Sequence, residues 1–416
     1  MSPAEPKQIP ARHDVLIAGG GLVGMTLGCA LAKAGLDVVV IDRDAPAEQQ
    51  EGAYDGRASA ISYGSAQVFK GIGLWDLIEA DVSPIRDVRV VDGNQIEGIS
   101  PLFLHYDHRD LGDEPLGYII ENRVTRVGLF KLAQTLENLI LISPVAVESL
   151  DRQRGYAEAH LSDGRVIRAD LAVAADGKFS PIREAAGISQ TTWKYDQTAI
   201  VCTVEHERDH EGVAVELFQP TGPFAMLPMT DNRSNIVWSE DPRVVKQLMA
   251  LDDVAFLAEL SEKFGDWLGK IRLTGPRFSY PLSFSLASTY LSERLVLAGD
   301  SGHGIHPIAG QGFNMGIRDV AALAEVLVDA KRLGLDLGGP MVLEKYEQWR
   351  RFDNVMLATV CDGLLRLFSN DNQPLRLARD MGLAAVNKLP PLKKLFMRHA
   401  MGVVGDLPRL VRGEAL

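Results

Sequence analysis

The chain has 416 residues, of which 46% are hydrophobic, so it can bury a large core and form two domains. Its formal net charge of −12 disfavours nucleic acid as the main partner. No uninterrupted apolar run reaches the roughly 18 residues that span a bilayer, and residues 1–13 lack the apolar core of a secretory signal. Three distant cysteines (Cys29, Cys202, Cys361) show neither pairing nor metal-ligand spacing, so we expect a reducing, cytoplasmic compartment and no metal site.

The N-terminal region carries a glycine-rich turn between an apolar strand at 15–18 and a helix that stops at Gly35. In such a turn Gly19 permits the bend, Gly21 lets the backbone approach a pyrophosphate, and Gly24 allows close packing of helix on strand. A second apolar strand, 38–41, ends at Asp42, whose carboxylate can accept the hydroxyls of a ribose. The pattern predicts a dinucleotide site, because a purely structural turn leaves Asp42 unexplained.

A second element follows the apolar strand 169–175, where Asp176-Gly177 precedes Ser180 and Arg183. The next stretch holds short β-rich segments at 198–204, 212–218, 224–228 and 234–238, which predict an antiparallel sheet. A helical stretch at roughly 244–264 follows them, and the strand 295–298 returns the chain to the nucleotide-binding part.

The third element is a glycine-rich segment that starts at Gly299-Asp300 and continues through Pro307 to Gly310-x-Gly312. Its apolar positions between Ile317 and Val328 have helical spacing, so a helix should open near Gly312. Three such elements in one chain are best explained by a single extended cofactor. There is no second fingerprint with its own strand and acid for a separate nicotinamide domain.

The C-terminal segment is basic within an acidic chain. From Arg376 to Arg412 eight basic residues face two acidic ones, a formal +6, and apolar residues are interleaved with them. Such a segment can sit against an anionic membrane surface, or it can be a helix that packs on the body with a solvated basic face. The sequence leaves both readings open.

The three elements in this order resemble the single-component flavoprotein aromatic hydroxylases, which share the fold of para-hydroxybenzoate hydroxylase. At a finer level the chain resembles the ubiquinone-biosynthesis hydroxylases of the 2-polyprenyl-6-methoxyphenol hydroxylase branch. That likeness is carried by the stretches 55–62, 73–75, 121–123, 222–228 and 351–354, and it extends from about residue 14 to 402.

The resemblance implies an α/β fold: a Rossmann-like FAD-binding domain, an inserted antiparallel-sheet substrate domain and a C-terminal helical segment. We expect residues 14–75, 105–190 and 285–340 in the FAD-binding domain and 76–104 and 191–284 in the substrate domain. Residues 341–416 would form the helical, basic segment, for which membrane contact is one expectation.

The resemblance also implies a monooxygenase. FAD would be reduced by NAD(P)H or by a ferredoxin-type donor and would react with O2 to give a C4a-hydroperoxide, which hydroxylates the ring of a polyprenyl phenol in ubiquinone biosynthesis. A hydroxylase of a soluble aromatic substrate, a flavin oxidase or dehydrogenase, and a non-catalytic scaffold of a quinone-synthesis complex remain alternatives. The implied partners are a ubiquinone-synthesis complex, a second copy in a homodimer and the inner face of the cytoplasmic membrane.

By the same resemblance Asp300 binds the ribityl chain, Pro307 lies against the isoalloxazine ring, and the helix opening near Gly312 faces the flavin pyrimidine. Pro307 and Arg57 are the expected catalytic residues. The expected cofactor-binding residues are Gly19, Gly21, Gly24, Asp42, Arg57, Arg126, Asp176, Gly177, Arg183, Gly299, Asp300, Pro307, Gly310, Gly312 and Asn314. Arg183 would contact either a nicotinamide phosphate or only its strand–helix turn. His303 and His306 are interpreted as loop histidines beside the flavin, and no general base for the phenol is identified.

Overall fold

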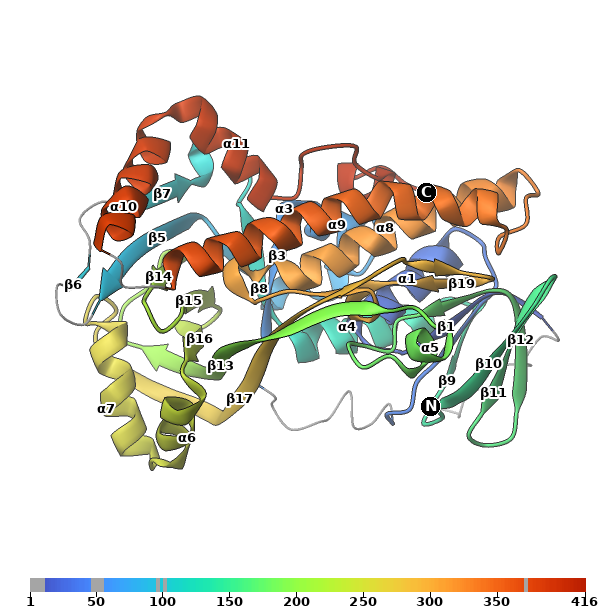
Figure 1. Cartoon of the computed structure of the whole chain (residues 1–416), viewed down its shortest axis with the longest axis horizontal. Coiled ribbons are helices and arrows are strands. Elements are labelled where there is room, and N and C mark those ends of the chain that lie inside the picture. The colour runs from blue at the N-terminus through green and yellow to red at the C-terminus, as the bar shows by residue number, and fades with distance from the viewer. Residues whose placement is uncertain (1–11, 46–55, 95–97, 100–102, 370–372) are drawn as a thin grey trace.

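The computed structural model describes residues 12–45, 56–94, 98–99, 103–369 and 373–416. Asp55, the first residue of one stretch that carries the resemblance, lies outside them. Two large sheets, a small three-stranded sheet and a set of long helices make up the described fold (Figure 1). It is the predicted α/β arrangement, with helices at the C-terminal end.

The first sheet is built on parallel strands that carry the glycine-rich turn. Its order is β10-β11-β12-β1-β2-β9, and β19 pairs with the C-terminal half of β12. Its strands are β1 (His13–Ala18), β2 (Val38–Ile41), β9 (Leu139–Ile142), β10 (Val147–Gln153), β11 (Tyr156–Leu161), β12 (Val166–Ala174), β18 (Leu291–Ser292) and β19 (Leu295–Leu297). β1 and β2 are buried along their whole length, as continuous apolar runs in a parallel sheet require.

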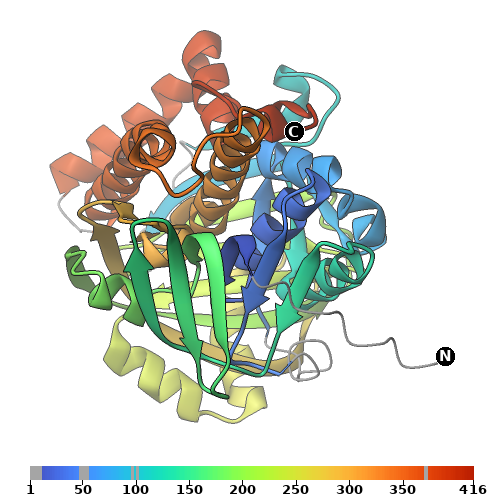
Figure 2. The ribbon, with the colours of Figure 1, turned by 90° about the vertical axis from the view of Figure 1, so that its right-hand side faces the viewer.

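Helices pack on this sheet and bring the glycine-rich segments together. α1 (Leu22–Lys33) follows the turn after β1 and packs against α8 (Gln311–Arg332) and α4 (Asn122–Gln134). In Figure 2 the strands face the viewer, with α8 and α9 stacked above them. A small third sheet has the order β3 (Ala58–Ser62), β8 (Gly117–Glu121) and β4 (Ser83–Ile85), and α3 (Tyr63–Ile72) follows β3.

The second sheet has the order β20-β17-β13-β16-β15-β14-β5-β6, with β7 paired to β5. Its strands are β5 (Asp87–Asn94), β6 (Gly98–Ile99), β7 (Leu104–Asp107), β13 (Gln190–His206), β14 (Val213–Phe218), β15 (Phe224–Met229), β16 (Arg233–Glu240), β17 (Ile271–Ala287) and β20 (His303–Gly304). All its pairs are antiparallel except β14 with β5, which is parallel.

One face of the second sheet is covered by two helices, α6 (Pro242–Ala250) and α7 (Asp253–Phe264). The sequence predicted one helical stretch here. It divides because the Asp252 side chain accepts the N–H of Ala255 at 2.8 Å and starts a new helix. The opposite face of the sheet borders a large cavity.

The C-terminal segment packs back onto the body. α9 (Pro340–Phe368) lies along α8, and α10 (Gln373–Lys388) and α11 (Pro390–Ala400) follow it (Figure 1). Met397 of α11 is fully buried, and Val411 joins the core of the first sheet. Four of the basic residues form ion pairs within the chain: Arg379 with Asp92, Lys393 with Asp110, Arg409 with Asp329 and Arg412 with Glu414. Part of the segment therefore completes the fold.

The remaining elements are short. α5 (Pro181–Ala185) follows β12, with Ser180 as its N-cap. Turns of 3-10 helix lie at Trp75–Leu77, Glu79–Asp81, His108–Asp110, Gly299–Ser301, Ile308–Gly310 and Arg409–Arg412.

Candidate cofactor and substrate site

A cavity of about 1420 Å³ extends between the two sheets. That is larger than the 300–1,000 Å³ of an ordinary small-molecule pocket, so it has room for more than one ligand. Its walls come from the turn after β1, the start of α8, the inner face of the second sheet and the C-terminal helices α9, α10 and α11. The three glycine-rich segments, although far apart in the sequence, therefore meet at one space.

The glycines of the first turn divide into two roles. A Cβ on Gly19 would lie 2.3 Å from the carbonyl oxygen of Ala175, and one on Gly24 would lie 1.9 Å from that of Gly19. These two glycines allow the backbone segments to pack closely. Gly21 borders the cavity, and a Cβ there would meet no heavy atom within 4 Å. The start of α1 at Gly21 thus offers open space where free helix N–H groups attract an anion.

Acidic and basic side chains flank this turn. Asp42, at the end of β2, accepts the N–H of Gly20 and, at 2.7 Å, that of Asp44, and burial raises the pKa of its carboxyl group. Arg126 of α4 lines the same cavity. Both predicted residues thus border the cavity together with Gly21.

The third glycine-rich segment forms the adjoining wall. Asp300 lies deep in the molecule but faces the cavity, and burial raises the pKa of its carboxyl group, partly offset by His303 and Lys178. It makes no side-chain hydrogen bond to another described residue. Pro307, Gly310 and Gly312 line the cavity where α8 begins, and Gly310 caps that helix with a φ of +61°.

The comparisons with known proteins agree with this geometry. A family profile described as FAD binding domain matches residues 12–352. Ubiquinone hydroxylase UbiL of Rhodospirillum rubrum is 51% identical over 406 residues, which cover 97% of this chain and 93% of that protein. The chain belongs to this family of FAD-dependent monooxygenases.

Other relatives and solved structures extend the comparison. The 3-demethoxyubiquinol 3-hydroxylase of Escherichia coli is 34% identical, with 94% of this chain and 98% of that protein covered. The crystal structure of p-nitrophenol 4-monooxygenase PnpA from Pseudomonas putida superposes with a TM-score of 0.76 at 20% identity, covering 94% and 99% of the two chains. At that identity the structural likeness supports the monooxygenase fold alone.

FAD fits the residues that line the cavity. The space in front of Gly21 is one that a Cβ would fill, which suits a pyrophosphate close to the backbone. Asp42 and Asp300 supply carboxylates toward the cavity at two separate places, as a ribose and a ribityl chain require. The start of α8 supplies N–H groups and the positive end of a helix dipole.

Five of the predicted cofactor-binding residues do not line the cavity: Gly19, Gly24, Asp176, Arg183 and Gly299. Gly299, with a φ of +64°, packs against Val23. Arg183 is buried and donates at 3.0 Å to the carbonyl oxygens of Lys178 and Ser301, so its guanidinium holds the strand–helix turn to the third segment. This arrangement favours the turn over the nicotinamide-phosphate interpretation.

Asp176 is also set back from the cavity. Burial raises the pKa of its carboxyl group, which the Ser180 hydroxyl and the Ile182 N–H partly offset, although both lie outside strict hydrogen-bond geometry. Gly177, with a φ of +88°, does line the cavity. The middle element therefore contributes backbone to the wall and side chains to the scaffold.

Asn314 and Arg57, two of the predicted cofactor-binding residues, both line the cavity but differ in their contacts. Asn314 lines the cavity, but its side chain donates to Ala60 O at 2.8 Å and accepts the N–H of Ser62 at 2.8 Å. It fixes β3 to the start of α8. Arg57, just before β3, is exposed and lines the cavity.

The two loop histidines lie in different surroundings. His306 lines the cavity, shares a 3.1 Å hydrogen bond with Gln197 and accepts the Ile308 N–H, and burial lowers its pKa to about 4. It is therefore neutral. His303 faces away from the cavity and lies 2.6 Å from Asp319.

Asp319 organises a buried network that the sequence did not predict. Burial alone would raise its pKa, but His303 and Arg350 outweigh that effect and hold it well below its usual value. Arg350 donates to Asp319 at 3.0 Å and to Asn354 at 2.7 Å, so α8, α9 and the third glycine-rich segment are tied together. Asn354 falls in the stretch 351–354, which carried part of the family resemblance and was the sequence feature that could have pointed to this network.

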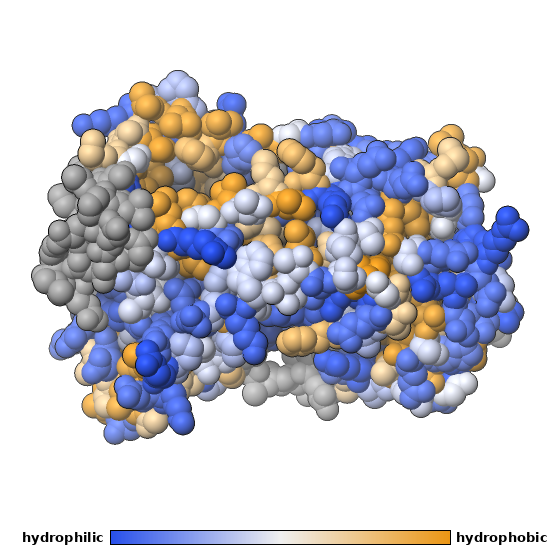
Figure 3. All heavy atoms as spheres, viewed as in Figure 1, coloured by the Kyte–Doolittle hydropathy of each residue, from blue (hydrophilic) through white to orange (hydrophobic). Residues whose placement is uncertain are grey.

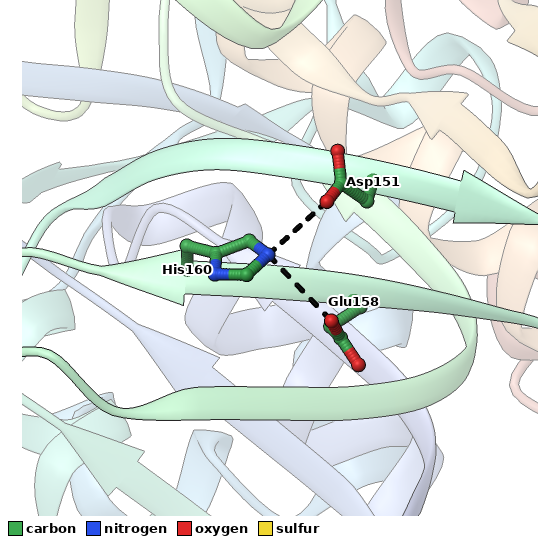
Figure 4. A group of neighbouring side chains, drawn as sticks. All are labelled: Asp151, Glu158 and His160. Atoms are coloured by element: carbon green, nitrogen blue, oxygen red, sulfur yellow. Dashed lines mark hydrogen bonds and ion pairs between the residues drawn. The ribbon is translucent and has the colours of Figure 1, made fainter.

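A second group of polar side chains lies on the β10–β11 hairpin, far along the sheet from the turn. Asp151, Glu158 and His160 bring their ligand atoms within 4.8 Å of one another (Figure 4). His160 lies 3.2 Å from Asp151, and Glu158 pairs with Arg168 at 2.5 Å. These ion pairs account for the group, and it gives no reason to infer a metal.

Proposed function

We propose that this protein hydroxylates the aromatic ring of a polyprenylated phenol in ubiquinone biosynthesis. The proposal rests on the relatives, several of which are named as hydroxylases or monooxygenases of ubiquinone or its biosynthesis. It rests equally on the shape of the cavity. No feature of the described residues favours a soluble aromatic substrate or a simple oxidase over this reading.

The cavity continues from the cofactor end to the surface of the C-terminal helices. Leu364 of α9 and Phe396 of α11 both line it, although their exposed fractions are 41% and 44%. Residues that border the interior and the surface at once mark an opening. The substrate ring would lie inside beside the second sheet, while the polyprenyl chain leaves between these helices.

FAD, when bound, supplies the activated oxygen in this chemistry. The chain's own residues bind, orient and exclude water. We propose that Gly21, Asp42 and Arg126 hold the nucleotide end, that Asp300 and the start of α8 hold the flavin end, and that Pro307 and Arg57 face the reacting ring. NAD(P)H or a ferredoxin-type protein would supply electrons, and O2 is the oxidant.

Membrane contact follows from the same surface. Exposed apolar residues of the C-terminal half of α9, of α10 and α11 and of the link between them include Met356, Val360, Leu364, Met381, Leu389, Leu395 and Phe396, while Met341 and Phe352 are exposed nearer the start of α9. We call the former set the apolar patch; Figure 3 shows apolar residues gathered over these helices. Lys388, Lys394 and Arg398 are exposed beside it without an ion pair to any described residue. A basic rim around apolar side chains suits peripheral contact with an anionic bilayer.

None of the helices in the described part of the chain combines the length and apolar character of a membrane span. We therefore propose peripheral binding to the inner face of the cytoplasmic membrane. A ubiquinone-synthesis complex and a homodimer remain predictions of the family resemblance.

Vesicle flotation tests the membrane contact. Truncation after Pro390 is unsuitable because it removes the buried Met397 and Val411. Substituting Leu395 and Phe396 by Ser should weaken binding to vesicles that contain anionic lipid. Leu333→Ser, an exposed apolar residue on α8's C-cap, is the matched control and should bind as wild type. Unchanged binding of the double variant would contradict the proposal.

The pathway is tested by a lipid-extract profile of a strain lacking the gene. We expect a polyprenyl phenol lacking one hydroxyl to accumulate and ubiquinone to be lost, with both reversed when the gene is restored. The mass and fragmentation of the intermediate identify the ring position. Normal ubiquinone without an intermediate, in a strain without a redundant hydroxylase, would refute the substrate assignment.

A further inference from the structure

The inner face of the second sheet is almost entirely apolar. The side chains that this sheet turns toward the cavity include Val88, Val90, Ala214, Phe218, Ala225, Leu227 and Val237. Glu216 of β14 lies among them, in register between Val90 on β5 and Ala225 on β15. Among the described strands of this sheet, it is the only carboxylate on the cavity wall.

Glu216 has no partner that would explain its position. No hydrogen bond or ion pair joins its side chain to another described residue. Among the described residues, the buried carboxylates of Asp319 and Asp92 are paired with Arg350 and Arg379. Asp300, which also lacks a side-chain hydrogen bond, faces the cofactor end of the cavity, whereas Glu216 lies on its apolar wall. Burying a carboxyl group without a partner is costly, so the fold itself gives no reason to keep one here.

The surroundings of Glu216 suit proton transfer. The Glu216 side chain lies deep in the molecule, where it lines the cavity. Burial raises its pKa to about 7, close to the value at which a general base works best near neutral pH. A carboxyl group on an apolar wall is a recurring arrangement for acid–base chemistry.

We propose that the carboxylate of Glu216 accepts a hydrogen bond from the phenolic O–H of the substrate and takes its proton as oxygen is transferred to the ring. This inference rests on the proposed function. The O–H bond breaks, its electron pair stays on the ring oxygen and enriches the ortho and para carbons, and the proton forms the acid of Glu216. Glu216 returns that proton to the same oxygen as aromaticity is restored. The hydrogen on the hydroxylated carbon leaves as a proton to water, and one proton from water goes to the cofactor in place of the oxygen atom that is transferred, so charge balances. The carboxylate itself is neither oxidised nor reduced.

Three other ionisable groups on the cavity wall have pKa values far from 7. Burial raises the pKa of Tyr106 on β7 to about 12 and of Cys361 on α9 to about 11, and it lowers that of His306 to about 4. The cofactor end adds Asp42, Asp44, Arg57, Arg123, Arg126, Lys178 and Asp300. Of these, Asp42 and Asp300 have raised pKa values, so the assignment of a pH effect to Glu216 needs the variant.

Ligand binding tests the contact without turnover. The oxidised holoenzyme is titrated with a short-chain prenylphenol and with its O-methyl ether, following the perturbation of the flavin absorbance. In wild type the phenol should bind more weakly, by up to about tenfold, as pH falls from 8 to 6, because a charged acceptor with a pKa of about 7 is lost. The ether should show no such change. A phenol that binds wild type with the pH response of its ether would overturn the proposal even if no variant folds.

Single turnover tests the proton transfer. Enzyme reduced with dithionite is mixed with O2 and the prenylphenol, so the natural electron donor is not needed. In Glu216→Gln we expect product formation to slow by about 10²-fold or more, with the oxygen diverted to hydrogen peroxide. We expect the wild-type rate to rise through pH 7 and this rise to be absent in the variant. Glu262→Gln, exposed on α7 behind the same sheet, is the matched control.

The outcomes separate the two levels of the argument. If wild type forms no hydroxylated phenol, the proposed function fails. If wild type hydroxylates and Glu216→Gln matches it in rate, coupling and pH profile, only the role of Glu216 is refuted. Flavin content and circular dichroism equal to wild type establish that a slow variant is folded.

Discussion

Two glycines of the first turn should respond oppositely to the same substitution. Gly21→Ala adds a Cβ that meets no heavy atom within 4 Å, at a φ of −68° that any residue adopts. Alanine is worse than glycine as a helix N-cap by about 0.5–1 kcal/mol but gains about 0.4–1 kcal/mol by restricting the unfolded chain. The free energy of unfolding of the apoprotein should therefore change by less than about 1 kcal/mol. Gly24→Ala, whose Cβ would lie 1.9 Å from the Gly19 carbonyl oxygen, should cost about 1–3 kcal/mol or more.

FAD affinity should be reduced directly by Gly21→Ala, the substitution that leaves the stability of the apoprotein nearly unchanged. The Cβ of Gly21→Ala would enter the space reserved for the pyrophosphate and displace it from the helix N–H groups. Losing one charge-assisted hydrogen bond, worth about 1.5–3 kcal/mol, weakens binding by about 10- to 100-fold.

Urea unfolding of the apoproteins and titration of FAD by quenching of its fluorescence measure the two effects separately. Gly21→Ala should fold as wild type and bind FAD weakly, whereas Gly24→Ala should unfold at lower urea. A Gly21→Ala protein that binds FAD with wild-type affinity would refute the placement of the pyrophosphate at this turn.

Two further predictions concern buried acids. Asp319→Asn leaves His303 and Arg350 without their charged partner, so the free energy of unfolding measured in urea should fall by about 3–5 kcal/mol. The control is Asp353→Asn, at a half-exposed partner of Arg350, which should lower it by less than about 1 kcal/mol. Equal effects of the two substitutions would contradict the network. Glu216 has a folded pKa near 7 against 4.5 unfolded, so it destabilises the fold increasingly as pH rises from 4.5 to 7, and Glu216→Gln should raise stability at pH 8 by at most about 3 kcal/mol but not at pH 4. A gain that is the same at both pH values would contradict the burial of this acid.

The sequence predicted those parts of the fold that depend on local pattern. Continuous apolar runs specify β1 and β2. The turn between β1 and α1 needs Gly19 and Gly24 because a Cβ at either position would clash with backbone atoms. Short alternating segments between turns specified β14, β15 and β16. Each of these signals lies within a few residues of the element it predicts.

What the sequence did not predict depends on distant pairing. Asp319 and Arg350 lie on different helices, and nothing in the local sequence of either shows that they meet. Glu216 sits in a β-rich run whose two faces cannot be told apart without the register to β5 and β15. Arg183 matched a family motif, yet its direction, toward the Ser301 carbonyl oxygen, is set by tertiary structure.

The C-terminal segment shows the limit of composition. Its formal +6 left two interpretations open, a surface that contacts a membrane and a helix packed on the body. The structure pairs Arg379, Lys393 and Arg409 with acids on distant elements and Arg412 with the nearby Glu414. The exposed remainder is smaller and lies beside the apolar patch. Charge counts over residues 376–412 cannot separate the two groups, because three of the four acidic partners are distant in the sequence.

The most direct test of the central claim is the fate of isotope-labelled O2 in a single turnover with a short-chain prenylphenol. If the protein is such a hydroxylase, we expect mass spectrometry to detect a product that carries one labelled oxygen atom on its ring. Hydrogen peroxide as the sole labelled product, with the phenol recovered unchanged, would contradict the assignment of this protein as a hydroxylase of prenylated phenols.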